Sequence, residues 1–234
     1  MQSYIVCRGN NSRICTNFCP SLHTTNVEIA LVGLSTYYSY PNVDERNNII
    51  LINDKKVSLI KGCYEVKDIN SALTKEGGGA TVTSNPVSLK VEMTIKEGYV
   101  VTFPDKNSLG DLLGFAAGVY RAGTHTSQRI CNILRVNNIL IQCDVIGGSS
   151  INGRPAPVIY SYSPNVGAGR KIVSEPRYPI YLPVTVDRIT ELNVWATDQD
   201  NNLLDLQNED LIITFHIRDA LSTIRGSFGP GPGK

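Results

Sequence analysis

The last third of the chain, residues 138–218, is the feature that most limits how this sequence can fold. Short segments rich in Val, Ile, Tyr and Thr follow one another: "ILIQCDVI", "PVIYSYSP", "YPIYLPV", "RITELNVWATD" and "DLIITFHIRD". Gly, Pro, Asn and Asp residues separate them, as in the turn "QDNN" at 199–202. Such runs, bounded by turn residues at roughly ten-residue spacing, are typical of antiparallel strands in a sandwich. Because strands and helices do not alternate along the chain, a parallel α/β fold is disfavoured.

Earlier segments show the same period of two. Residues 27–31 and 88–95 alternate apolar with other residues, which predicts strands with one buried and one exposed face. Residues 47–60 form two apolar runs around Asn53-Asp54-Lys55-Lys56, the pattern of a hairpin. In the segment 210–219, "DLIITFHIRD", one predicted face carries Leu211, Ile213, Phe215 and Ile217.

Helical signals are few. Asp68 is placed to cap a short helix that runs to about Lys75 and ends at Gly77-Gly78-Gly79. Residues 108–118 form either a brief helix broken by Gly114 or a loop that packs on the sheet. Residues 118–128 are interpreted as a loop because Gly, Thr and Ser predominate.

Composition favours one large all-β domain and gives no sign of a charged partner. The chain has 234 residues, 41% of them apolar, and 22 Lys and Arg against 21 Asp and Glu. This balance argues against broad binding to nucleic acid or to an anionic membrane. No run approaches the roughly 18 apolar residues of a membrane span, and the N-terminus lacks the apolar region of a secretory signal. We expect an arm at 1–24, one folded domain at 25–218 and a flexible tail at 219–234.

The residues that carry chemistry are scattered. Cys15, Cys19 and His23 have part of the spacing of a zinc site, but a closed site needs four ligands, and unpaired thiols are the simpler interpretation. His125 lies in a predicted loop. The residues of Asp198-x-Asp200-x-Asn202 fit a hairpin turn better than a calcium loop, because the Gly of that loop is missing. We therefore predict no catalytic, cofactor-binding or metal-binding residues and no enzyme activity.

Aromatic residues point instead to a contact surface. Trp195 falls on the side of its strand opposite to Leu192, Val194 and Ala196, and Tyr37, Tyr38 and Tyr40 cluster in "STYYSYPNV". Such residues are enriched in protein interfaces because they bring large area at low entropic cost. Packing beneath a loop of the same domain is the alternative, and the sequence does not decide between them.

Several segments together resemble the single jelly-roll penton (minor capsid) proteins of polinton elements, adintoviruses and virophages. The resemblance covers residues 27–218 and is carried by "VEIALVGLSTYYSYPNV", "LLGF", "NNILIQCDVIGGSSINGRPAPVIYSYSP" and the block from "EPRYPIYLPV" to "LIITFHIR". His216 and Arg218 stand in the last of these patterns. The chain departs from the family where Tyr38 or Tyr40 replaces a usual tryptophan, and residues 1–24 match nothing in it.

The resemblance implies a single eight-stranded antiparallel jelly-roll sandwich with at most one or two short helices. It also implies a structural role as a homopentamer at the fivefold vertices of an icosahedral virion, beside a double jelly-roll major capsid protein. We expect Trp195, Tyr37, Tyr38, Tyr40, His216 and Arg218 to lie at the subunit interface. A jelly-roll module that binds a ligand or carbohydrate is the alternative, and a cupin-type metalloenzyme is a third possibility that the isolated histidines disfavour.

Overall fold

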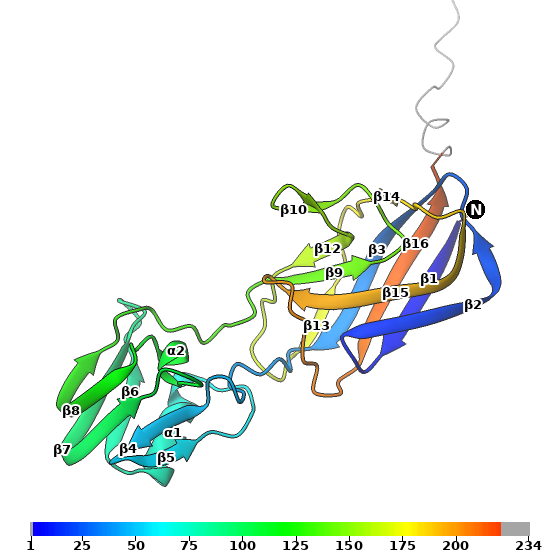
Figure 1. The fold of residues 1–234 in the computed structure, drawn as a ribbon. Helices are drawn as coiled ribbons and strands as arrows, with labels where there is room; N and C mark the ends of the chain where they lie inside the picture. Colours follow the sequence, from blue (N-terminus) through cyan, green and yellow to red (C-terminus); the bar gives the residue numbers. More distant parts are fainter. Residues whose placement is uncertain (1, 221–234) are drawn as a thin grey trace, which may run out of the picture. The chain divides into compact units, whose positions relative to one another are not determined.

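The computed structural model describes residues 2–220, which fold into two compact units. One unit is Tyr40–Arg135, called the inserted unit below; the segments on either side of it build the other, called the jelly-roll unit. Both are antiparallel β structures (Figure 1). In the described part of the chain, the longest helix has 11 residues, and no helix has the length and apolar character to cross a membrane.

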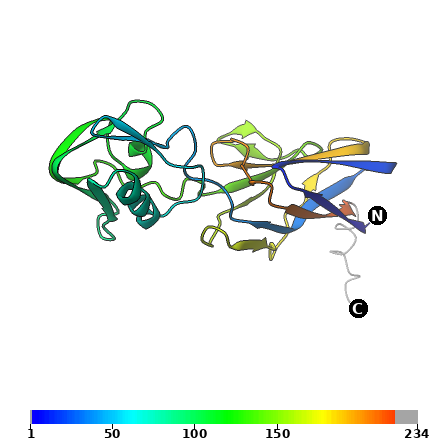
Figure 2. The same ribbon diagram turned by 90° about the horizontal axis from the view of Figure 1, so that it is seen from below.

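The jelly-roll unit consists of two sheets. In the first, the order is β1 (Gln2–Gly9), β16 (Leu211–Asp219), β3 (Val27–Tyr37) and β13 (Lys171–Ser174), with β14 (Leu182–Pro183) also on β3. In the second, it is β12 (Val158–Tyr162), β9 (Ile139–Cys143), β15 (Arg188–Asp198) and β2 (Arg13–His23). A two-stranded hairpin, β10 (Ser150–Ile151) and β11 (Arg154–Pro155), projects from the loop between β9 and β12. Figure 2 shows β2 and β15 in one layer and β3 and β16 in the other.

The pairing of these strands is that of a jelly roll. Of the eight main strands, the first pairs with the last (β1 with β16), the second with the seventh (β2 with β15), the third with the sixth (β3 with β13) and the fourth with the fifth (β9 with β12). A long hairpin folded over on itself gives this nested pattern, which defines the jelly roll. The all-β fold class and the jelly-roll architecture predicted from the sequence are confirmed.

The core of the jelly-roll unit lies between the two sheets. Inward-facing residues at every second position fill it, as the alternation in the sequence predicted. Phe215 and Ile217 of β16 are fully buried, as are Ile29 of β3 and Leu192 of β15.

The predicted arm at residues 1–24 is wrong. These residues form β1 and β2, and β1 pairs with β16 along its whole length, from Gln2 opposite Arg218 to Gly9 opposite Leu211. Ile5, Cys7 and Ile14 are buried in the core. The segment is rich in polar residues, and those of β2 lie mostly on its solvent side. Of the predicted tail, Asp219 belongs to β16, and residues 221–234 lie outside the described residues.

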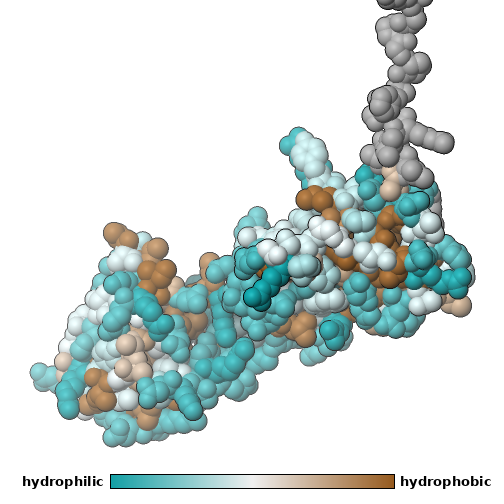
Figure 3. Space-filling model, turned by 45° about the horizontal axis from the view of Figure 1, so that its top comes forward, coloured by the Kyte–Doolittle hydropathy of each residue, from teal (hydrophilic) through white to brown (hydrophobic). Residues whose placement is uncertain are grey.

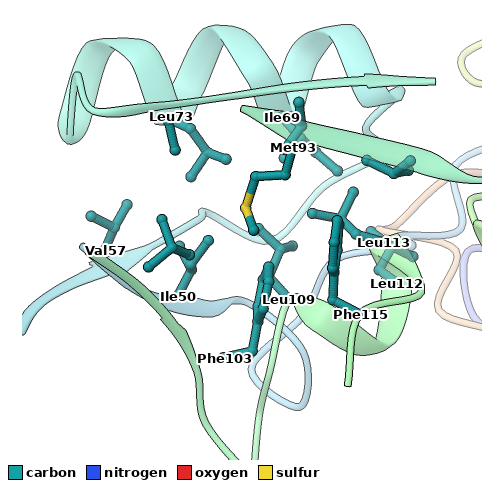
Figure 4. Close-up of a cluster of buried hydrophobic side chains, with 14 of the residues drawn as sticks. Ile50, Val57, Ile69, Leu73, Met93, Phe103, Leu109, Leu112, Leu113 and Phe115 are labelled. Atoms are coloured by element: carbon teal, nitrogen blue, oxygen red, sulfur yellow. The ribbon is translucent and has the colours of Figure 1, made fainter. Parts of the chain in front are cut away.

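The single domain predicted at 25–218 is also corrected, because the inserted unit interrupts it between β3 and β9. This unit has a sheet in the order β5 (Lys55–Ser58), β4 (Ile49–Ile52), β7 (Val91–Phe103) and β6 (Ala80–Ser84), with β8 (Gly118–Thr126) also on β7. Two helices accompany it, α1 (Val66–Glu76) and α2 (Gly110–Leu113). It has its own hydrophobic core, in which Met93 and Phe103 of β7 meet Ile69 of α1 and Leu113 of α2 (Figure 4).

Local predictions in the inserted unit are mostly confirmed. The hairpin β4–β5 turns at Asn53 and Asp54, whose φ values of 49° and 61° are the left-handed values of a tight hairpin turn. Helix α1 begins at Val66, three residues earlier than a cap at Asp68 predicts, because Glu65 is the N-cap residue. Asp68 lies at the third helical position and accepts a hydrogen bond from the Glu65 backbone N–H at 2.9 Å. Residues 110–113 form a brief helix that ends at Gly114. The loop predicted at 118–128 is wrong, since most of it is strand β8 paired with β7.

Both ends of the inserted unit are tied together by buried polar groups. The Asn42 side-chain amide donates to the carbonyl of Ile133 at 3.0 Å, and Asp44 pairs with Arg135 at 3.1 Å and with Arg46 at 2.5 Å. Asp44 is 6% exposed. Burial by itself raises the pKa of its carboxyl, but the hydrogen bonds from Arg46 and the charges of Arg135 and Arg46 together outweigh it, so the pKa lies below its ordinary value. The segments through which the chain enters and leaves this unit are thus held next to each other.

Candidate assembly surface

The residues with potential for chemistry do not gather into a site. In residues 2–220, no three His, Cys, Asp or Glu side chains are grouped as metal ligands. His125 lies on β8, where its Nε2 contacts the carbonyl of Arg121 at 2.7 Å and its ring meets the Tyr120 ring edge-on. Asp198 accepts hydrogen bonds from the backbone N–H groups of Asp200 and Asn202, which confirms a turn here. A single bridge between Thr197 and Leu203 closes it, and the flanking strands β15 and β16 belong to different sheets.

His216 and Arg218 meet on the outer face of the first sheet, as part of a cluster. We call this group of five residues the β16 cluster: Tyr4 of β1, Glu28 of β3, Tyr181 just before β14, and His216 and Arg218 of β16. The Tyr181 hydroxyl lies 2.7 Å from His216 Nδ1, and the Tyr4 and His216 ring centroids are 4.9 Å apart. The cluster joins β1, β16 and β3 to the segment before β14.

Arg218 is the centre of the cluster. Its guanidinium carbon lies 3.4 Å from the centroid of the Tyr181 ring, and its Nε and Nη2 donate to Glu28 Oε2 at 3.1 and 3.0 Å. The side chains of Arg218 and Glu28 are each 26% exposed, so water screens this pair less than a fully exposed one. Arg218 and His216 are therefore engaged inside the chain, and the part of the cluster open to a partner is Tyr4.

Tyr4 belongs to an exposed apolar stripe on an edge strand. Tyr4 is 70% and Val6 60% exposed, and they project from β1 on the side opposite to the buried Ile5 and Cys7. Among the described residues, β1 pairs with β16 only, so one row of its backbone N–H and C=O groups has no strand beside it. A long, exposed, apolar edge strand is the kind of surface that natural monomers avoid, because it pairs readily with another chain.

The four remaining candidates lie elsewhere. Trp195 is half-buried on the outer face of the second sheet, on the opposite side of the sandwich, where the Arg13 guanidinium carbon lies 5.7 Å from its ring centroid. Tyr37, at the end of β3, is 41% exposed. Tyr38 and Tyr40 are buried at 8% and 3% exposure, so the structure does not present them to a second subunit. The six predicted residues therefore do not form one surface.

A second apolar surface lies beside β12, the outermost strand of the second sheet. Here Val158 and Tyr160 of β12, Leu31 of β3, and Tyr178, Ile180 and Leu182 line a hollow of about 330 Å³, called the β12 groove below. Its lining is mostly apolar, and two of its residues are largely solvent-exposed, Tyr178 at 76% and Ile180 at 71%. Figure 3 shows hydrophobic side chains gathered on the jelly-roll unit, among hydrophilic ones.

Sequence reasoning missed the residues that stand out most. The sequence predicts an arm at Tyr4 and Val6 because four consecutive apolar residues, Tyr4 to Cys7, hide the period of two. Tyr178 and Ile180 were assigned to a strand, whereas the structure has an irregular segment between β13 and β14. The signal available was the series Pro176, Pro179 and Pro183, which disfavours a regular strand through Tyr178 and Ile180.

Comparison with known proteins gives a likeness in structure and none in sequence. No protein-family model matches the chain, and no curated protein sequence matches it. Among solved structures, that of the mavirus penton protein is similar, with a TM-score of 0.50 over 93% of this chain and 99% of that chain, at 10% sequence identity. The likeness thus extends beyond the jelly-roll unit into the inserted unit. It confirms the fold of a single jelly-roll penton protein, which the sequence resemblance implied.

Proposed function

We propose that this chain is a penton protein, a structural subunit of an icosahedral virus capsid that assembles as a homopentamer at the fivefold vertices. One observation carries the proposal: the likeness to the mavirus penton protein spans nearly the full length of both chains, so the inserted unit is shared as well as the common jelly roll. In this proposal the protein is located in the virion. Its neighbour at the vertex is a double jelly-roll major capsid protein.

The exposed surfaces support assembly rather than action as a solitary molecule. A ring of five identical subunits needs a heterologous interface, in which two different patches of the same chain meet. The stripe of Tyr4 and Val6 on β1 is an exposed apolar patch on an edge strand, and we propose that it is one half of that interface. The β16 cluster supports this role because the His216 ring packs on Tyr4, and the Tyr181 hydroxyl in turn holds His216.

The test is the mass of the purified chain in native mass spectrometry, alone and mixed with the major capsid protein of the same virus. We expect a pentamer in at least one of these conditions. In Val6→Lys the pentamer should be lost, because a lysine in the apolar contact leaves a charge buried without a partner. Val119→Lys is the matched control: Val119 is 61% exposed against 60% for Val6, but it lies on β8 of the inserted unit.

Two results would contradict the proposal. A chain that stays monomeric in both conditions, and appears in no assembled shell by negative-stain microscopy, is not a penton subunit. A pentamer that tolerates Val6→Lys, with circular dichroism unchanged from the parent chain, would remove the β1 stripe from the interface while keeping the assembly. Specific binding on a glycan array by a monomeric chain would favour a carbohydrate-binding module instead.

A further inference from the structure

The β12 groove lacks a cover in the described part of the chain. Its floor is apolar, with Leu31 and Ile159 buried, and its rim carries Tyr178 and Ile180, both more than two-thirds exposed. Single apolar residues on a surface are ordinary, but large ones next to an apolar hollow mark a place where another segment binds. The rim is built from a segment with two prolines, Pro176 and Pro179, which holds a fixed course without a strand partner.

The C-terminal segment leaves the described structure close to this groove. Strand β16 ends at Asp219, and the Ala220 backbone N–H donates to the carbonyl of Asn26 at 2.8 Å. Leu182, a lining residue of the groove, lies opposite Ile29 of β3, and Ile29 lies opposite Ile217 of β16 on its other side. Two strand spacings, about 10 Å, therefore separate Ile217, two residues before the end of β16, from Leu182 in the groove wall.

The segment that follows has the length and the composition to cover the groove. Residues 221–234 read "LSTIRGSFGPGPGK" and can span about 46 Å when extended. They contain three large apolar residues, Leu221, Ile224 and Phe228, and no acidic residue. Large apolar side chains gain free energy when they leave water for an apolar surface, and the β12 groove offers one.

We propose that residues 221–234 bind in the β12 groove of the same chain, with Ile224 and Phe228 covering Tyr178 and Ile180. Attachment in the same molecule favours this occupant over a second copy. A short connection gives the segment an effective concentration in the millimolar range, which a separate molecule in dilute solution does not reach. The inference does not depend on the proposed function, because it concerns a contact inside one chain.

The experiment uses the full chain and its own trypsin site. Cleavage after Arg225 should be slow in the parent protein because the segment is held in the groove. In Ile180→Asp, a carboxylate on the rim opposes docking of the apolar side chains, and cleavage at Arg225 should be at least tenfold faster. Val173→Asp is the matched control: Val173 is 62% exposed on β13, does not line the groove, and should leave the rate unchanged.

A second measurement identifies the place of binding. Benzoylphenylalanine at position 228 should, on illumination, crosslink to residues 158–162 or 176–182 of the same chain, identified by peptide mass spectrometry. Equal cleavage rates in the parent and Ile180→Asp would overturn the inference, as would a crosslink outside these segments. A crosslink to the groove of a second copy would overturn it too, yet it would leave the pentamer intact, so this inference and the proposed function fail separately.

Discussion

Replacement of Phe115 by alanine should destabilise the inserted unit and leave the jelly-roll unit almost unchanged. Phe115 is 1% exposed, its ring stacks on that of Phe103 at 5.2 Å between centroids, and the Tyr120 ring meets it edge-on at 5.5 Å. The cavity left by the substitution cannot close without moving these two rings. All the residues that line it belong to the core of the inserted unit, as Figure 4 illustrates for part of it.

The magnitude follows from the size of the side chain and of the unit. A buried Phe→Ala substitution costs about 3–5 kcal/mol. A unit of about 100 residues loses roughly 4–8 °C in midpoint temperature for each kcal/mol. The midpoint of the inserted unit should therefore fall by about 12–40 °C. The jelly-roll unit has a separate core, so its midpoint should move by no more than about 2 °C, since distant sites act almost additively.

Differential scanning calorimetry measures both midpoints in one scan. Phe215→Ala is the matched control, because Phe215 is fully buried in β16 of the jelly-roll unit and should shift the other transition. A single transition that moves in both variants would refute the reasoning, because it would mean that the two cores unfold as one cooperative structure. So would a Phe115→Ala shift below about 5 °C, which would mean that this core is loosely packed.

Three further predictions concern ionisable groups. The pKa of Asp44 is lowered in the folded state, so the stability that its carboxylate adds is present above the ordinary pKa of about 3.9 and is lost as the pH falls through the folded-state pKa. The midpoint temperature of the inserted unit should therefore decline in acid, and Asp44→Asn should make this decline smaller. Burial raises the pKa of Cys143 to about 12, so brief alkylation at pH 8, followed by mass spectrometry, should modify exposed Cys15 and spare Cys143 until the chain unfolds. Arg218→Met should lower the stability of the jelly-roll unit by about 1–2 kcal/mol in urea unfolding, since the cation–π contact and the ion pair are both lost; no change would mean that both are dispensable.

Much of the fold could be predicted because the strongest signals are local. The alternation in residues 211–217 reflects one buried and one exposed face, and the structure reproduces it at each position. The turn at Asn53-Asp54 and the end of a helix at Gly114 depend on backbone conformations that few residues adopt. Such features are set by neighbouring residues, so the sequence reveals them directly.

What could not be predicted depends on partners distant in sequence. Nothing within residues 2–9 shows that they pair with residues 211–218, more than 200 positions away. The boundary of the inserted unit was also missed, because no linker rich in Gly or Ser marks it; residues Asn42 and Asp44 look like ordinary turn residues until Ile133 and Arg135 are seen beside them. For the candidate surface, the apolar character of Tyr38 and Tyr40 was visible, but whether it served the core or an interface was decided by burial alone.

Asn42 and Asp44 bind Ile133 and Arg135, so the two ends of the inserted unit lie side by side. The connection between β3 and β9 is therefore a place where a whole domain can be inserted. An inserted domain whose two ends lie close together causes little distortion of the surrounding fold, since that fold need only supply two adjacent backbone positions. Other small domains with neighbouring termini should be accepted at the same place. The inserted unit could thus be exchanged, by evolution or by an engineer, while the two sheets of the jelly-roll unit stay as they are.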